Sequence, residues 1–286
     1  MAQPEIITAN SIAEALSWLD EYGTQGGAVL AGGTDLFLRW QSEVPKPQHI
    51  LYIGEIQELN GVDIRQDDIW IGSLTTMADI AKSTEIIKYA PSLTQAASVI
   101  GSPAVRERAT IGGNICNASP AADTATPLIA LNAEVEIRNS KESRSVAMDD
   151  LFTGPGETIL QKNELLTGII IPIIPYRRDF YHRLAQRKAL GIVKVSVAVT
   201  ATKVDGKLYD VRIVLGAVAP IPLLAHKTMA VLEEKHPTIT LIEQAVNMAM
   251  EECNPIDDIR STIEYRRLMV GELLREGIDK LNTDDR

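Results

Sequence analysis

Two short segments pair adjacent glycines with small polar residues, a combination suited to holding an anion. They are Ala31-Gly32-Gly33-Thr34-Asp35 and Thr110-Ile111-Gly112-Gly113-Asn114. Glycine admits a positive φ angle and leaves backbone N–H groups open to an anion, while Thr and Asn add short donors without bulk. One Gly-Gly pair is weak evidence, because ordinary turns also need glycine. Two such pairs in similar contexts predict two walls of one phosphate-binding site.

Several of the polar candidates also have a purely structural interpretation. Thr34 and Asp35 suit the cap of a following helix, but the matching second segment favours ligand contact. For Asp123, capping of the segment that follows it and contact with the ligand are about equally favoured. Arg106 and Arg108 resemble phosphate clamps, yet solvated helix charges or subunit contacts are the preferred interpretation.

The chain lacks the motifs of the commoner nucleotide, metal and hydrolase sites. Neither a P-loop nor a Gly-x-Gly-x-x-Gly sequence after a strand is present, and the four histidines are isolated from one another. Ser119 is not in a Gly-x-Ser-x-Gly elbow and is interpreted as a turn residue or ligand donor. The two cysteines, Cys116 and Cys253, cannot ligate an iron–sulfur cluster alone. We therefore predict no catalytic side chain and no metal ligand in this chain.

Composition limits the class of protein. The 286 residues carry a net charge of −10, which disfavours nonspecific attraction to nucleic acid. The start of the chain has no basic region followed by a long apolar run. The longest strongly apolar run, residues 169–174, is far shorter than the ~20 residues that span a bilayer. A cytoplasmic protein with no membrane span is the expectation.

The elements around the first glycine segment resemble a βαβ unit. A capping box of Ser11 and Glu14 predicts a helix, and residues 28–31 form an apolar strand that runs directly into Gly32-Gly33. Residues 50–53 predict another strand. This order of strand and glycine turn is typical of a nucleotide-binding edge.

The second glycine segment lies in a region of mixed helix and strand pattern. The linker that ends this region is predicted at residues 172–175 and the charged residues 177–179. Strands are predicted at 62–64, 69–71 and 134–137, and helices from Thr76, at 91–100 and at 103–108 with Ser102 as the cap.

The last third predicts a hairpin followed by helices. Residues 193–203 and 208–218 read as strands joined by Asp205-Gly206, a strong hairpin turn. Two further capping boxes predict helix starts, at Thr240 with Glu243 and at Ser261 with Glu264.

Residues 101–127 place the second glycine segment in a distinctive context. They read Gly-Ser-Pro-Ala-Val-Arg-Glu-Arg-Ala-Thr-Ile-Gly-Gly-Asn-Ile-Cys-Asn-Ala-Ser-Pro-Ala-Ala-Asp-Thr-Ala-Thr-Pro. This block closely resembles the FAD-binding medium subunit of the molybdenum hydroxylases, the group of xanthine dehydrogenase and carbon monoxide dehydrogenase. The first glycine segment and the tail Tyr265-Arg266-Arg267 also resemble that family, so the similarity extends over nearly the whole chain.

The resemblance implies an α+β chain with a two-subdomain FAD-binding fold of the vanillyl-alcohol oxidase and p-cresol methylhydroxylase type. That domain would occupy residues 1–176, with subdomains of about 1–58 and 59–176. Residues 177–286 would form a smaller α+β domain with an antiparallel sheet and helices. The residues implied to contact FAD are Ala28, Val29, Leu30, Ala31, Gly32, Gly33, Thr34, Asp35, Thr110, Ile111, Gly112, Gly113, Asn114, Asp123, Leu165 and Arg183, of which the last is otherwise interpreted as a strand-end charge.

In function, the resemblance implies an FAD-carrying electron-transfer subunit that contains no other cofactor. A large molybdenum–pterin subunit and a small subunit with two [2Fe-2S] clusters would be its partners, and NAD or another compound would accept the electrons. The family holds FAD noncovalently, so Cys116 is expected to be a buried structural thiol. Two alternatives remain at this stage: a stand-alone flavin oxidase or reductase of the same fold, and a non-enzymatic nucleotide-binding scaffold.

Overall fold

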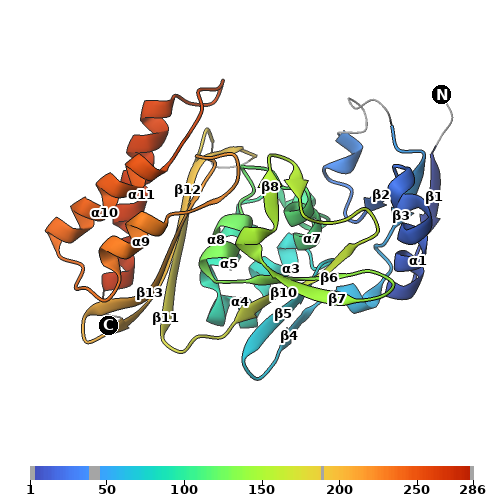
Figure 1. Cartoon of the computed structure of the whole chain (residues 1–286), viewed down its shortest axis with the longest axis horizontal. Helices are drawn as coiled ribbons and strands as arrows, with labels where there is room; N and C mark the ends of the chain where they lie inside the picture. Colours follow the sequence, from blue (N-terminus) through green and yellow to red (C-terminus); the bar gives the residue numbers. More distant parts are fainter. Residues whose placement is uncertain (1–3, 39–45, 188–189, 284–286) are drawn as a thin grey trace.

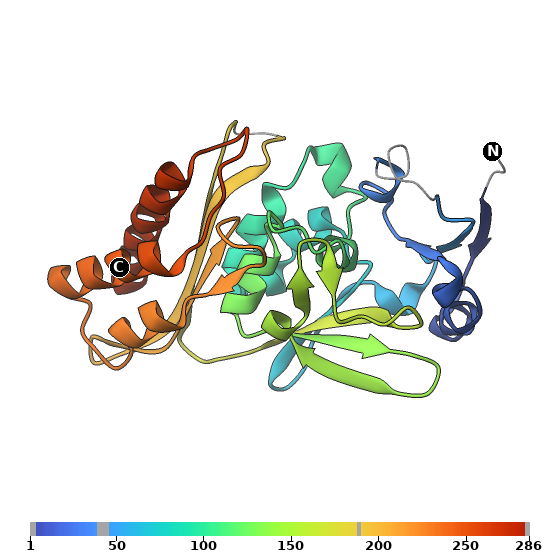
Figure 2. The same cartoon turned by 45° about the horizontal axis from the view of Figure 1, so that its top comes forward.

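The computed structural model describes residues 4–38, 46–187 and 190–283. Three larger sheets follow one another along the longest axis of the molecule, with helices packed beside each (Figures 1 and 2). The expected α+β class is confirmed, including an antiparallel sheet with helices in the last third of the chain. In the described ranges no helix is both long and apolar enough to cross a bilayer.

The N-terminal sheet is parallel and has three strands in the order β1-β3-β2, with helix α1 beside it. These elements are β1 (Glu5–Thr8), α1 (Ile12–Tyr22), β2 (Ala28–Leu30) and β3 (His49–Tyr52). The Ser11 hydroxyl caps α1 by accepting from the Glu14 N–H, as the sequence predicts. In a capping box the Glu14 carboxylate would accept from the Ser11 N–H, but here it accepts from the Asn10 N–H at 2.7 Å. Leu16 and Leu19 of α1 are buried.

The central sheet is antiparallel, in the order β4-β5-β10-β6-β7. Its strands are β4 (Val62–Ile64), β5 (Asp68–Gly72), β6 (Glu134–Arg138), β7 (Ser143–Ala147) and β10 (Leu165–Pro172). The apolar run that is too short for a bilayer begins in β10, where Ile169 and Ile171 are fully buried. The helices between β5 and β6 are α3 (Met77–Lys82), α4 (Thr84–Tyr89), α5 (Pro91–Ser98), α6 (Pro103–Arg106), α7 (Ile111–Cys116) and α8 (Ala125–Ala130). The small hairpin of β8 (Phe152–Gly154) and β9 (Glu157–Thr158) precedes β10.

The C-terminal sheet is buried on both faces. Its order is β11-β12-β13-β14, from β11 (Arg177–Ala185), β12 (Val193–Val204), β13 (Lys207–Gly216) and β14 (Leu223–Leu224). Val195, Val197 and Val199 lie in the core that includes α10 (Ile239–Glu252) and α11 (Ile263–Asn282), after the shorter α9 (His226–Leu232). Tyr181 and Ala198 face the other way and join the core of the central region. This second face fixes the C-terminal sheet against helices α5 and α8.

Three predicted boundaries differ from the structure. The N-caps of α10 and α11 are Thr238 and Thr262, whose hydroxyls accept from backbone N–H groups three residues on. Thr240 is therefore already helical, and Ser261 pairs with Asp258 in an isolated β-bridge. Residues 177–179, expected in a linker, begin β11, because burial of that strand against α5 orders them. The Asp205-Gly206 turn is confirmed, with φ of 49° and 75°.

Candidate cofactor site

The two glycine segments and Leu165 meet around one cavity of about 450 Å³. That volume lies in the range of small-molecule and cofactor sites, roughly 300–1,000 Å³. The predicted site residues that line the cavity are Val29, Ala31, Gly32, Gly33, Thr34, Asp35, Thr110, Gly112, Gly113, Asn114 and Leu165. The predicted site residues outside this lining are Ala28, Leu30, Ile111, Asp123 and Arg183. The fold thus brings two segments that are distant in the sequence to one cavity.

The first wall is a turn, as the sequence predicts. It follows β2, and Gly33 has a φ of 73°, a conformation that favours glycine. Among the described residues, none accepts a hydrogen bond from the backbone N–H of Gly32, Gly33 or Thr34. Residues 36–38 directly after this turn are helical, so Thr34 and Asp35 lie at a helix start as well as at the cavity. Bare N–H groups at such a place suit a bound anion.

The second wall is the first turn of helix α7. The sequence predicted a glycine turn with bare N–H groups here, and that prediction is wrong. The Ile111 and Gly112 N–H groups donate to the carbonyls of Thr75 and Ser73, at 3.0 and 2.8 Å. The Gly113 N–H donates to the Thr110 hydroxyl, which caps the helix. These donors are satisfied by protein acceptors, so side chains must supply the polar contacts of this wall.

The glycines of the two walls have different physical reasons to be glycine. A Cβ atom on Gly32 would lie 1.8 Å from the Arg108 carbonyl oxygen, and one on Gly112 would lie 2.7 Å from the Ser73 Cβ. Both positions therefore allow two protein segments to approach each other closely. A Cβ on Gly113 would meet only the Thr110 hydroxyl, at 3.0 Å, and Gly113 is exposed in the cavity. Gly113 is thus open toward a ligand.

One edge of the cavity carries an ion pair with a buried carboxylate, which the sequence did not suggest. Glu164 lines the cavity, and both of its carboxylate oxygens accept from Arg144, at 3.0 and 2.9 Å. The hydrogen bond from Arg144 is the main reason that the pKa of Glu164 lies below its ordinary value. Glu164 therefore stays ionised at neutral pH and is a poor candidate for a proton donor.

Cys116 corrects one prediction. It was expected to be a buried structural thiol, but the side chain is exposed and lines the cavity, because helix α7 turns it toward the same side as Gly113. Desolvation by the surrounding protein raises the pKa of Cys116 to about 12, although the side chain is accessible through the cavity. The thiol therefore stays protonated at neutral pH.

The charged candidates outside the lining are paired within the protein. Asp123 accepts from Arg183 at 2.7 Å and from the Tyr181 hydroxyl at 2.6 Å. Asp123 does not cap α8, whose N-cap is Thr124, and Arg183 is a buried residue within β11 rather than a strand-end charge. Desolvation raises the pKa of Asp123 above its ordinary value, although Arg183 opposes this shift.

Arg106 and Arg108 each donate to a backbone carbonyl. Arg106 donates to Ile100 at 3.0 Å, and Arg108 donates to Gly32 at 3.3 Å. Neither guanidinium lines the cavity, so the clamp interpretation finds no support. Arg108 instead ties the first wall to the loop before the second, a contact that sequence spacing does not reveal.

Sequence reasoning missed about half of the lining, chiefly its apolar part. These residues come from inside predicted elements, such as Ile53 and Val105, as well as from the segments around them, and most are apolar residues to which the sequence assigned only a structural role. They are Leu36, Ile53, Ser73, Leu74, Ile100, Val105, Ala109, Cys116, Asn117, Leu160, Glu164 and Leu166. The signal that could have found some of them is the position of Ser73 and Leu74 directly after strand β5.

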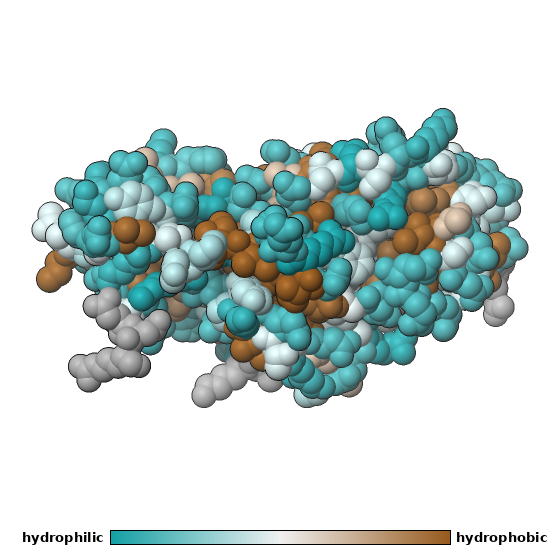
Figure 3. Space-filling model, turned by 90° about the horizontal axis from the view of Figure 1, so that it is seen from below, coloured by the Kyte–Doolittle hydropathy of each residue, from teal (hydrophilic) through white to brown (hydrophobic). Residues whose placement is uncertain are grey.

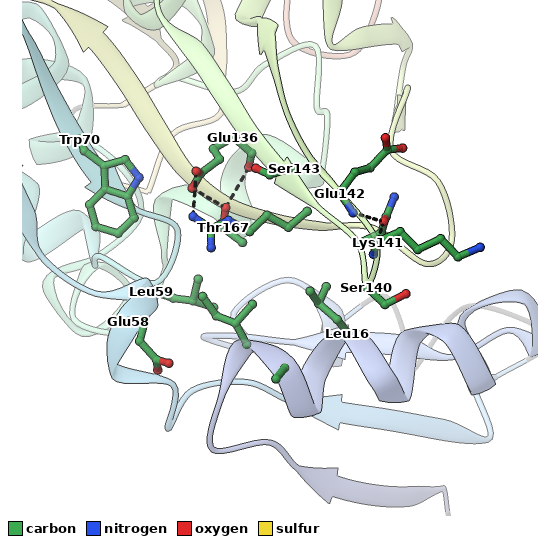
Figure 4. A pocket seen from close by; sticks show the side chains of 14 residues that line it. Leu16, Glu58, Leu59, Trp70, Glu136, Ser140, Lys141, Glu142, Ser143 and Thr167 are labelled. Atoms are coloured by element: carbon green, nitrogen blue, oxygen red, sulfur yellow. Dashed lines mark hydrogen bonds and ion pairs between the residues drawn. The ribbon is translucent and has the colours of Figure 1, made fainter.

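A second hollow of about 680 Å³ lies between α1 and the central sheet. Figure 4 shows Leu16 of α1 on one side and Trp70, Glu136 and Thr167 of the sheet on the other. Its rim carries both Lys141 and acidic residues, and none of the predicted site residues lines it. In the part of the chain that the structure describes, no three His, Cys, Asp or Glu residues gather as a metal site would require.

Comparison with known proteins supports FAD as the cofactor of this chain. A family model described as "FAD binding domain in molybdopterin dehydrogenase" matches residues 2–174, and one described as "CO dehydrogenase flavoprotein C-terminal domain" matches residues 180–281. The chain is 32% identical to the glyceraldehyde dehydrogenase medium chain of Sulfolobus acidocaldarius, covering 94% of this chain and 96% of that one. It is 27% identical to the xanthine dehydrogenase FAD-binding subunit of Escherichia coli O157:H7, covering 95% and 94%.

A solved structure from the same family has the same fold. A chain of carbon monoxide dehydrogenase from Hydrogenophaga pseudoflava superposes with a TM-score of 0.93 at 29% identity, covering 97% of this chain and 96% of that one. The resemblance inferred from residues 101–127 is therefore confirmed, and the protein is an oxidoreductase subunit that uses FAD. The chain belongs to the FAD-binding medium subunits of the molybdenum hydroxylase family.

Proposed function

We propose that the diphosphate of FAD lies between the two glycine walls and that Leu165 packs against the flavin part. The observation that carries this proposal is the single cavity lined by Gly33, Gly113 and Leu165, which are far apart in sequence. The bare N–H groups of the first turn suit the phosphate oxygens. From the second wall, the Thr110 hydroxyl and the Asn114 side-chain amide are the available donors.

In this proposal FAD is noncovalently bound and residues 1–176 hold it. FAD can exchange electrons singly or in pairs, so it can join one-electron donors to a two-electron acceptor. The protein positions FAD and excludes water, and no side chain of this chain acts as acid or base. Glu164 fits a role without acid–base catalysis, because its ion pair with Arg144 keeps the carboxylate ionised.

We propose further that [2Fe-2S] clusters of a small subunit supply the electrons and that substrate is oxidised at a molybdenum–pterin site in a large subunit. NAD is one candidate acceptor. Exposed hydrophobic side chains are available for docking, including Ile259 at 99% and Ile256 at 65% exposure. Figure 3 shows another gathering of hydrophobic residues near the middle of the lower face.

The test is purification of the chain from its native source under anaerobic conditions, with metal analysis and visible spectroscopy. We expect molybdenum and iron to copurify, FAD to be equimolar with this chain, and the flavin to bleach when heterocycles or aldehydes are added. Acid precipitation should leave the pellet colourless. A flavoprotein isolated alone, which oxidises its own substrate without metals, would refute the role as a subunit. A chain that neither carries nor takes up FAD would refute the cofactor site.

A further inference from the structure

The hollow between α1 and the central sheet is separate from the cofactor cavity, because the two share no lining residue. Its volume of about 680 Å³ also lies in the range of small-molecule sites, roughly 300–1,000 Å³. Helix α1 lines one side of the hollow with the apolar residues Ile12, Ala13 and Leu16. A ligand held there would have its own binding groups, independent of FAD.

The opposite side of the hollow is the polar face of the central sheet. Side chains alternate along β6, and the neighbours of Glu136 are buried in the core, so Glu136 and Arg138 face α1. Trp70 of β5 lies on the same face, and its indole passes over Gly168, where a Cβ atom would lie 2.2 Å from the indole nitrogen. Figure 4 shows Trp70 beside Glu136, with Leu16 of α1 across the hollow. A flat ligand would therefore meet an aromatic ring and polar groups on one side and apolar side chains on the other.

Arg138 and Glu136 form an ion pair that leaves hydrogen-bonding capacity on both partners. Arg138 donates through Nη2 to Glu136 Oε1 at 2.9 Å, and the Thr167 hydroxyl donates to Oε2 at 2.8 Å. Among the described residues, neither Nε nor the second terminal nitrogen of Arg138 has an acceptor. Each carboxylate oxygen of Glu136 can accept a further hydrogen bond. The side chains of Arg138 and Glu136 are 40% and 20% exposed, so a donor and an acceptor lie side by side within reach of the hollow.

Glu136 is an ionised acceptor at neutral pH. Desolvation alone would raise the pKa of Glu136, but the hydrogen bonds from Arg138 and Thr167 outweigh it and lower the pKa below its ordinary value. The guanidinium and the carboxylate offset each other, so an anion would meet Glu136 and a cation would meet Arg138. The pair therefore suits a neutral ligand.

The other charged residues of the lining select neither sign. Glu58, Lys141 and Glu142 are all exposed, and water and salt screen such charges. A neutral ring with a carbonyl next to an N–H, as in a lactam, presents an acceptor and a donor on one edge. That edge is the complement of an Arg–Glu pair, and the ring faces suit the Trp70 indole and the apolar side chains of α1.

We propose that the hollow is a second binding site, which takes a neutral planar lactam heterocycle. The lactam carbonyl accepts from Arg138 and its N–H donates to Glu136, while the ring lies between Trp70 and α1. The site needs neither FAD nor a partner subunit, so it stands apart from the proposed function.

The test is ligand-detected NMR titration of the full-length protein, with and without saturating FAD. The probe is 2-pyridone, and its matched control is N-methyl-2-pyridone, which keeps the ring and the carbonyl but lacks the N–H. We expect the control to bind about tenfold more weakly, because it leaves a charged acceptor without its donor. FAD should leave the Kd of 2-pyridone unchanged, since the two sites share no lining residue.

Two exposed positions on α1 give a matched pair of variants. Ala13→Phe places a ring in the hollow, whereas Ser17→Phe places the same ring one turn further along α1, outside the lining. The Kd of 2-pyridone should rise at least about tenfold in Ala13→Phe and stay at the wild-type value in Ser17→Phe. Arg138→Met keeps the aliphatic stem and removes the donors, and it should also weaken binding about tenfold.

Four results would overturn the inference. They are no binding of 2-pyridone, equal binding of the N-methyl control, displacement of 2-pyridone by FAD, and equal loss of affinity in the two phenylalanine variants. Tighter binding of benzoate than of 2-pyridone would overturn the neutral class of ligand. If Arg138→Met does not fold, the comparison of Ala13→Phe with Ser17→Phe decides the question. A chain that binds 2-pyridone but takes up no FAD would refute the proposed cofactor site and leave this second site supported.

Discussion

Gly113→Val is the sharpest test of the cavity, because the structure separates its effect on the fold from its effect on the cofactor. Gly113 is in the first turn of α7, and a Cβ there would meet only the Thr110 hydroxyl, at 3.0 Å. Valine is also a better helix former than glycine by a few tenths of a kcal/mol. The apoprotein should therefore fold, with a melting temperature within a few degrees of the wild type.

The same side chain would fill space that the cofactor needs. Displacing FAD from this wall would remove its proposed contacts with the Thr110 hydroxyl and the Asn114 amide, two residues that line the cavity. Each hydrogen bond to a charged phosphate contributes about 1.5 kcal/mol, or about 3 kcal/mol together. Since 1.4 kcal/mol corresponds to a factor of ten, the Kd should rise ~100-fold.

The assay is titration of apoprotein with FAD, followed by flavin fluorescence and by the absorbance ratio of the isolated holoprotein. Ala230→Val, an exposed position in helix α9, controls for a β-branched residue in a helix. Gly113→Ala should give an intermediate Kd. If Gly113→Val folds and binds FAD as tightly as the wild type, the second wall is not part of the FAD site.

Three further outcomes follow from the geometry. Gly112→Ala should lower the melting temperature of the apoprotein, measured by circular dichroism, because its Cβ would lie 2.7 Å from the Ser73 side chain; an unchanged value would contradict the close approach. At pH 7.5 and without FAD, Cys116 should react with iodoacetamide at least ~10³-fold more slowly than an ordinary thiol, since its pKa is about 12, and bound FAD should abolish the reaction; peptide mass spectrometry would refute this by finding rapid labelling or no protection. Asp258→Asn should destabilise the protein at pH 7, because Arg260 and Arg266 together outweigh desolvation and hold the pKa of Asp258 far below its ordinary value. That stabilisation is present above the unfolded-state pKa and is lost as the pH falls through the folded-state value, so the difference in melting temperature should shrink below about pH 4; a constant difference would refute the assignment.

Local signals in the sequence predicted most elements because their causes are local. The Ser11 cap, the proline at the start of α6 and the Asp205-Gly206 turn each depend on a few adjacent residues. The starts of α10 and α11 were misplaced because several Ser and Thr residues stand within three positions, and tertiary contacts select among them. At Ser261, pairing with Asp258 excludes it as the cap.

The site was harder to predict than the fold because most of its wall depends on long-range contacts. The glycine segments were recognisable, but the state of their N–H groups was not. Ser73 and Thr75 accept from the start of α7, and nothing in residues 110–114 indicates that these partners exist. The pairing of Asp123 with β11 joins residues about sixty positions apart, which spacing alone cannot reveal.

The contrast between the glycines bears on how the site forms. Gly32 and Gly112 are needed where the chain approaches Arg108 and Ser73, contacts made entirely within the protein. The two walls are therefore held in place by contacts within the protein. Walls fixed by such contacts would spend little binding energy on ordering the chain, so a small number of donors would suffice at the proposed diphosphate site. The proposed site would also suit an anionic cofactor in a strongly acidic chain. Its three N–H groups, which have no acceptor among the described residues, and its two side chains would act at short range, where the net charge of −10 has little influence.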